Sequence, residues 1–75
     1  MVSKQESRMA KIDALLLLIK KEHKNHSLYW IRNKFSYESG VSISTVKEYV
    51  EILEACDKID IGGIIDNGIG VKIKE

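Results

Sequence analysis

The sequence predicts an α+β fold in which three short helices precede a two-stranded β-hairpin. Apolar residues recur at helical spacing in three separate segments, and Gly40 interrupts the pattern between the second and the third. The last segment alternates isoleucine with polar residues around an Asn67-Gly68 turn signal. A chain of 75 residues has room for one domain, which is expected to span residues 1–75.

The first helix is expected over residues 7–22, after residues 1–6, which show no periodicity and are expected to fray. Its core stripe is formed by Met9, Ile12, Leu15, Leu16 and Ile19. At ~100° per residue, a second apolar group lies nearly opposite and consists of Ala10, Ala14, Leu17 and Leu18. Because a helix that is apolar on two sides usually has two partners, we expect a homodimer packed through this second face. The alternative is that the N-terminal arm or the hairpin covers it.

The second and third helices are expected over residues 27–38 and 42–56, each beginning at a serine N-cap, Ser27 or Ser42. The core positions are Leu28, Ile31 and Phe35 in the second helix and Ile43, Val46, Tyr49, Val50 and Leu53 in the third. Between the helices, the segment "SGVS" around Gly40 predicts a tight turn. Asp57 follows the third helix where a left-handed residue often ends a helix.

The hairpin is expected over residues 58–74. A two-residue turn at Asn67-Gly68 would leave the isoleucines of the first strand, Ile59 and Ile61, on the opposite face from Val71 and Ile73. One extra residue in the first strand would bring all four to the same face. Gly62-Gly63 is the natural place for such a β-bulge.

The run "GVSISTVKEYVEILEACDKIDI", in this order of elements, resembles the winged helix-turn-helix superfamily. The resemblance implies that the third helix reads the DNA major groove and that the hairpin, the wing, touches the flanking backbone. The chain departs from the family pattern at two places. Asp57 stands where the family usually has glycine, and Glu48 and Glu51 occupy the face on which DNA-binding members usually carry Arg or Lys.

By this resemblance, the predicted DNA contacts are Ser42, Ser44, Thr45, Lys47 and Glu48 on the third helix, Arg32 and Lys34 on the second helix, and Lys72 on the wing. Hydroxyl groups can bond to phosphates or bases, and a glutamate can accept from a cytosine amino group. Residues 1–35 carry eight Lys or Arg and three Asp or Glu, a charge of +5, whereas residues 36–75 carry four and eight, a charge of −4. Phosphate attraction is therefore expected to come mainly from outside the third helix.

The expected function is that of a sequence-specific double-stranded DNA-binding protein, a transcriptional regulator acting as a dimer. The alternative is a winged-helix module that docks another protein through its acidic third helix and Trp30, without binding DNA. An enzyme is not expected, because the sequence shows neither an acid–base pair at a recognisable spacing nor a cofactor-binding loop. No cofactor and no catalytic residue is predicted.

The composition also bears on metal binding and localisation. His23, His26 and Cys56 are too few and too scattered for a structural zinc site. The lone cysteine and the lack of a charged-then-apolar leader favour a reducing, cytoplasmic compartment. The longest apolar run, residues 14–19, is too short to span a membrane.

Overall fold

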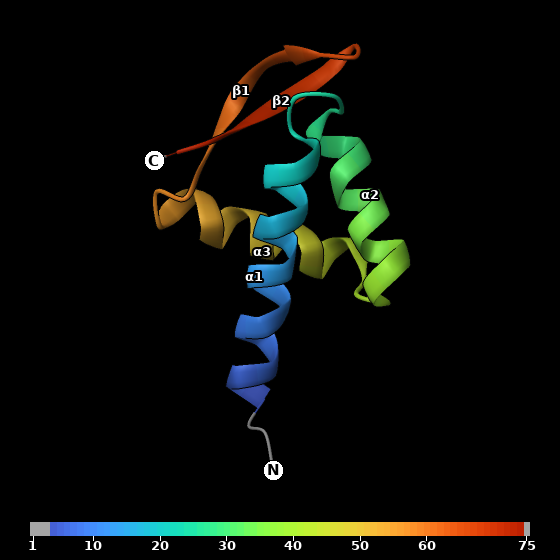
Figure 1. Ribbon diagram of the computed structural model, residues 1–75. Coiled ribbons are helices and arrows are strands. Elements are labelled where there is room, and N and C mark those ends of the chain that lie inside the picture. Colours follow the sequence, from blue (N-terminus) through green and yellow to red (C-terminus); the bar gives the residue numbers. More distant parts are fainter. Residues whose placement is uncertain (1–3, 75) are drawn as a thin grey trace.

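The computed structural model describes residues 4–74, which form three helices followed by an antiparallel hairpin (Figure 1). The elements are α1 (Lys4–Glu22), α2 (Leu28–Ser39), α3 (Ile43–Ala55), β1 (Ile59–Ile65) and β2 (Gly68–Ile73). The predicted α+β fold of three helices and a hairpin is therefore confirmed, and this order is compatible with a winged-helix topology.

The helix ends follow from local side-chain chemistry. The predicted serine caps are both present, since the Oγ of Ser27 accepts from the backbone N–H of Trp30 at 3.3 Å and the Oγ of Ser42 accepts from that of Thr45 at 3.4 Å. Gly40, with φ 76°, ends α2, and Asp57, with φ 59°, follows α3 in the left-handed conformation.

The start of α1 differs from the prediction. The helix begins at Lys4, three residues before the predicted start at residue 7, and residues 1–3 of the segment expected to fray lie outside the described part of the chain. The segment Lys4-Gln5-Glu6 contains only good helix formers and no residue that breaks a helix. Nothing in the sequence therefore stops the helix from extending one turn towards the N-terminus.

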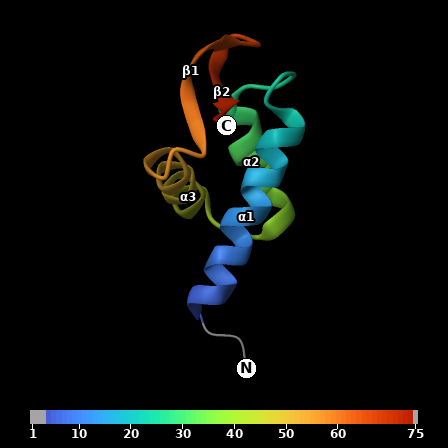
Figure 2. The same ribbon diagram turned by 60° about the vertical axis from the view of Figure 1, so that its left-hand side comes forward.

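The core lies where the three helices meet the inner face of the hairpin. Its buried apolar residues are Ile12, Leu15, Ile19, Leu28, Ile31, Phe35, Val41, Val46, Tyr49, Val50, Leu53, Ile59 and Val71. Two predicted core residues, Leu16 and Ile43, are only half-buried, and Met9 is 53% exposed. Met9 is exposed because the N-terminal half of α1 extends beyond the other elements, as Figures 1 and 2 show from two sides.

The hairpin register confirms the predicted bulge and corrects the predicted turn. Ile61 pairs with Val71, the register then shifts across Gly62-Gly63, and Ile64 pairs with Ile69. The turn is formed by Asp66 and Asn67, with φ of 53° and 62°, one residue earlier than predicted. Aspartate and asparagine tolerate the left-handed conformation, so the turn does not require a glycine.

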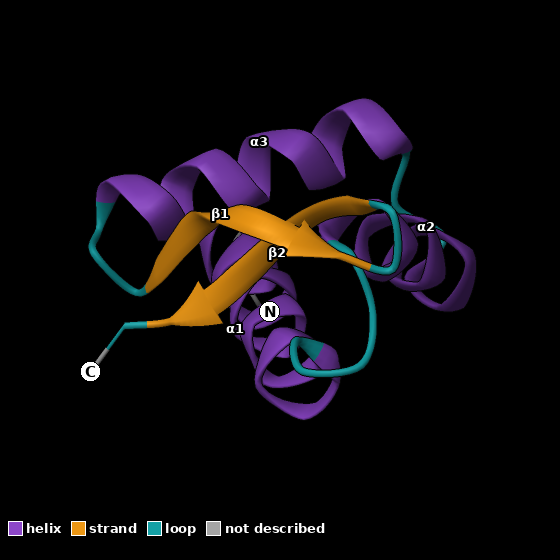
Figure 3. Cartoon of the chain, turned by 90° about the horizontal axis from the view of Figure 1, so that it is seen from above, coloured by secondary structure: helices purple, strands orange, loops and turns teal. Residues whose placement is uncertain are grey.

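Gly68 is instead required for close packing against α2. A Cβ at this position would lie 2.9 Å from the Cβ of Ser27, well inside van der Waals contact. The start of β2 is therefore held against the N-terminus of α2. Figure 3 shows the hairpin lying over one end of α1 and α2 and alongside α3, where β1 packs on α3 and β2 packs on α1 and α2.

Candidate nucleic-acid interface

The first turn of α3 presents polar side chains at the surface. Ser44, Lys47 and Glu48 are exposed, as is the cap residue Ser42, and Thr45 is half-buried. The Oγ of Ser42 donates to the Oγ1 of Thr45 at 3.0 Å and lies 3.3 Å from the Oγ of Ser44. These three hydroxyls form a cluster at the helix N-terminus, where the helix dipole favours negative charge. The cluster and Lys47 together are called the leading turn below.

A hollow of about 320 Å³ separates the leading turn from the N-terminal half of α1. It is called the α1-side hollow and is lined by Ser7, Arg8, Lys11, Thr45, Glu48 and Tyr49. The guanidinium carbon of Arg8 lies 5.9 Å from the ring centre of Tyr49, a cation–π distance that holds this side chain beside α3. Two cations therefore stand on this flank.

Arg8 and Lys11 were not among the predicted site residues. A signal for them exists in the sequence, because at helical spacing both lie beside the buried Ile12 and Leu15 on the same side of α1. Side chains on the same side of a helix as its core residues lie near whichever element packs against that side. The sequence does not show which element that is; the tertiary packing makes it α3.

A second hollow, of about 400 Å³, lies on the other flank of α3 and is called the wing-side hollow. Its lining residues are Leu28, Tyr29, Arg32, Lys47, Val50, Glu51, Glu54, Ile61 and Ile69. It thus brings together Arg32 and Lys47, two of the predicted DNA contacts. The same hollow contains the carboxylates of Glu51 and Glu54, so its formal charge is balanced.

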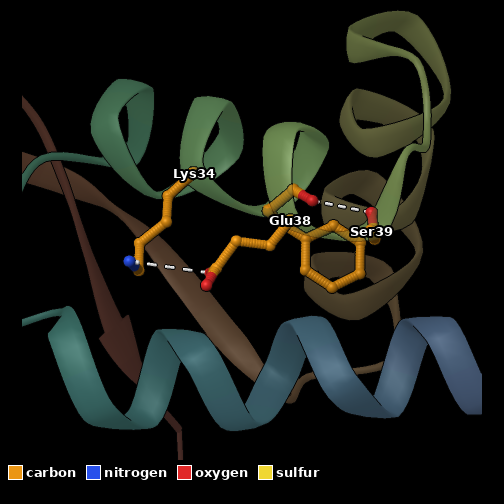
Figure 4. A network of polar contacts seen from close by, with 4 residues as sticks. Lys34, Glu38 and Ser39 are labelled. Carbon is orange, nitrogen blue, oxygen red and sulfur yellow. Dashed lines mark hydrogen bonds and ion pairs between the residues drawn. The ribbon is translucent and has the colours of Figure 1, made fainter.

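Lys34 lies on a different side of α2 from Arg32. Its Nζ is 3.6 Å from the Oε1 of Glu38 and 5.4 Å from the ring centre of Trp30, which stacks on His26 at 3.5 Å. Figure 4 shows Lys34 and Glu38 reaching towards one another on the side of α2 that faces α1. Residues two apart on a helix point in very different directions, so Lys34 lines neither hollow beside α3.

Lys72 is also separated from the leading turn. It is exposed on β2 and lines a third hollow with His23 and Lys24, between the α1–α2 loop and the hairpin. No residue of α3 lines that hollow. Of the three predicted phosphate-binding cations outside α3, the structure therefore brings only Arg32 next to the leading turn.

The proposed dimer face on α1 is partly open. Ala10 and Ala14 are exposed and Leu17 is 66% exposed, so the hairpin does not cover them. Leu18, in contrast, is half-buried and packs against the core. The open apolar surface of this face within residues 4–74 is therefore narrower than the sequence predicted.

No protein-family model matches the chain, and the searches of curated proteins and of solved structures found no match either. None of the helices within residues 4–74 has the length and apolar character that crossing a bilayer requires. In the same part of the chain, no three His, Cys, Asp or Glu side chains gather closely enough to hold a metal ion.

Proposed function

We propose that the chain is a sequence-specific double-stranded DNA-binding protein and a transcriptional regulator, with the leading turn of α3 in the major groove. The observation that supports the proposal is the set of cations on both sides of that turn. Arg8 and Lys11 stand on the α1 flank and Arg32 on the wing flank, with Lys47 on α3 itself. These residues come from three helices, and the three cations outside α3 add to the phosphate attraction of its single lysine.

In this arrangement the hydroxyls and Lys47 meet bases or phosphates, and Glu48 accepts from a cytosine amino group. Glu51 and Glu54 lie one to two turns further along α3, where a helix that enters the groove by its N-terminus leaves the DNA. The repulsion between these two carboxylates and the DNA phosphates is therefore weaker than the number of glutamates on α3 suggests.

The salt dependence of binding tests the proposal. Fluorescence anisotropy with a labelled random-sequence duplex should show log K falling linearly with log salt concentration. If each of the four cations neutralises one phosphate, the slope is roughly −3 to −4 per chain. Absence of binding even at low salt would overturn the proposal. A selection from random duplexes then identifies the preferred sequence.

We also propose that the protein acts as a homodimer packed through Ala10, Ala14 and Leu17. The two alanines allow the close approach of a second helix. This face points away from the side of α1 that carries Arg8, and Lys11 lies at its border. The leading turn lies on α3, outside this face. Sedimentation of Leu17→Glu should give a monomer. Met9→Glu, which adds the same charge at another exposed apolar position of α1, should leave the dimer intact. A monomeric parent protein, or a dimeric Leu17→Glu variant, would contradict this interface.

The alternative of a protein-docking module has one observation in its favour. The wing-side hollow has apolar side chains between its charged ones, and two large exposed residues, Tyr29 at 69% and Ile69 at 61%, line it. Such a mixture suits a peptide segment as well as a DNA backbone. A docking module should show little affinity for duplex DNA at any salt concentration, which separates the two functions.

A further inference from the structure

The third hollow, between the α1–α2 loop and the hairpin, has a different charge from the wing-side hollow. It has a volume of about 460 Å³, and its ionisable lining residues are His23, Lys24 and Lys72, with no Asp or Glu among them. The cross-strand partner of Lys72 is Asp60, which does not line the hollow, and no ion pair joins the two. The hollow, called the basic hollow below, therefore attracts anions.

Gly62 lines this hollow and leaves space in it, because it has no side chain. Its φ is outside the left-handed region, and a Cβ added to it would meet no atom within 4 Å. Neither backbone conformation nor internal packing therefore requires glycine at this position. What the missing side chain provides is space, since Gly62 and Gly63 both line the hollow.

The remaining wall is apolar. Ile64, Ile65 and Val71 line the hollow, and Ile64 is 88% exposed. An apolar wall beside a few cations is the usual composition of a site for a small organic ligand, and the volume lies within the range of about 300–1,000 Å³ that such sites occupy.

We propose that the basic hollow binds a phosphate-bearing small molecule. Lys24 and Lys72 hold the phosphate group, and the organic part of the molecule lies over Gly62 and against the apolar wall. This activity goes beyond the proposed DNA binding and does not depend on it, because no residue of α3 lines the basic hollow.

A titration of the ¹⁵N-labelled full chain followed by NMR tests the proposal. Inorganic phosphate and adenosine monophosphate are the probes, with adenosine as the uncharged match and chloride keeping the ionic strength constant. Both phosphates should shift the amide signals of Gly62, Gly63 and Gly70, with the nucleotide binding more tightly, while adenosine should bind at least about tenfold more weakly than the nucleotide.

The variants locate the site. Lys24→Ala and Lys72→Ala should each weaken nucleotide binding about tenfold, because each removes one charge-assisted contact. Gly62→Val should abolish binding by filling the space that Gly62 leaves, and Lys58→Ala should change nothing. A dispersed spectrum checks the fold of Gly62→Val, and if that variant is unfolded the two lysine variants decide.

Three outcomes overturn the proposal. In the first, neither phosphate probe moves the three glycine signals. In the second, nucleotide binding is the same in the lysine variants as in the parent. In the third, duplex DNA moves these signals while both small probes fail, which would assign the basic hollow to backbone phosphates of DNA.

Discussion

The two halves of α3 differ in their electrostatic surroundings. The N-terminal half carries the hydroxyl cluster with Lys47 and Glu48, lies at the positive end of the helix dipole, and has Arg8 and Lys11 of α1 beside it. The C-terminal half carries Glu51 and Glu54 at the negative end of the dipole. A count of charges over the whole helix, one lysine against three glutamates, hides this difference. What matters for binding a polyanion is which end of the helix approaches it.

The largest expected effect comes from reversing two positive charges at the N-terminal half of α3, one on α3 itself and one beside it on α1. The double variant Arg8→Glu/Lys47→Glu should lose about a hundredfold in duplex affinity, roughly tenfold for each phosphate contact, and its salt slope should fall by about two. Anisotropy with the random-sequence duplex measures both quantities. Lys20→Glu/Lys58→Glu makes the same change in net charge away from α3 and should lose far less. Equal losses would mean that only net charge matters.

A second variant should change the stability of the protein without changing its DNA affinity. Gly68→Ala should lower the free energy of unfolding by about 1–3 kcal/mol, because the new Cβ overlaps with Ser27. Gly62→Ala, where the Cβ meets nothing, is the matched control. Urea denaturation measures both variants. Below its Tm, Gly68→Ala should bind duplex DNA as the parent does, since Gly68 lines neither of the two hollows beside the leading turn. Equal stability of the two variants would contradict the packing of β2 on α2.

Removing the cap of α3 should have an effect of about 1 kcal/mol. Ser42→Ala deletes the acceptor for the Thr45 N–H and should lower Tm by about 4–8 °C. Ser44→Ala, an exposed hydroxyl of the same cluster, should change stability by no more than about 0.5 kcal/mol. Thermal unfolding followed by circular dichroism measures both. If Ser44→Ala cost as much as Ser42→Ala, the capping role of Ser42 would be refuted.

The smallest expected effect is at the C-terminal half. Glu51→Gln/Glu54→Gln should raise duplex affinity only about two- to threefold, because exposed charges that do not touch the DNA are screened by salt. Asp13→Asn/Asp60→Asn removes two carboxylates elsewhere and is the control in the same anisotropy assay. A clear loss of affinity would show that the glutamates themselves contact the DNA, which would contradict the comparison.

The features that the sequence predicted correctly depend on chemistry within a few residues. Ser27 and Ser42 act as caps, and Gly40 ends α2. A bulge at Gly62-Gly63 was needed to place the isoleucines of both strands on the same face of the hairpin. Each follows from a side chain and its own backbone, or from the alternation along one strand.

The features that it missed depend on packing between distant segments. The turn lies at Asp66-Asn67, and the glycine predicted for it, Gly68, instead packs against Ser27, more than forty positions earlier in the chain. Arg8 lies beside α3, and Lys34 and Lys72 lie away from it, because of how the helices and the hairpin cross. A linear pattern shows which residues are charged but not which of them share a surface.

Mapping the duplex-binding surface by NMR tests the central claim most directly. With a tight-binding duplex from the selection and the ¹⁵N-labelled chain, the amide signals of Ser44, Thr45 and Lys47 and those of Arg8 and Lys11 should shift. The signals of Glu54 and Ala55 should stay in place. Shifts concentrated at Glu54 and Ala55, with the leading turn unmoved, would contradict the account.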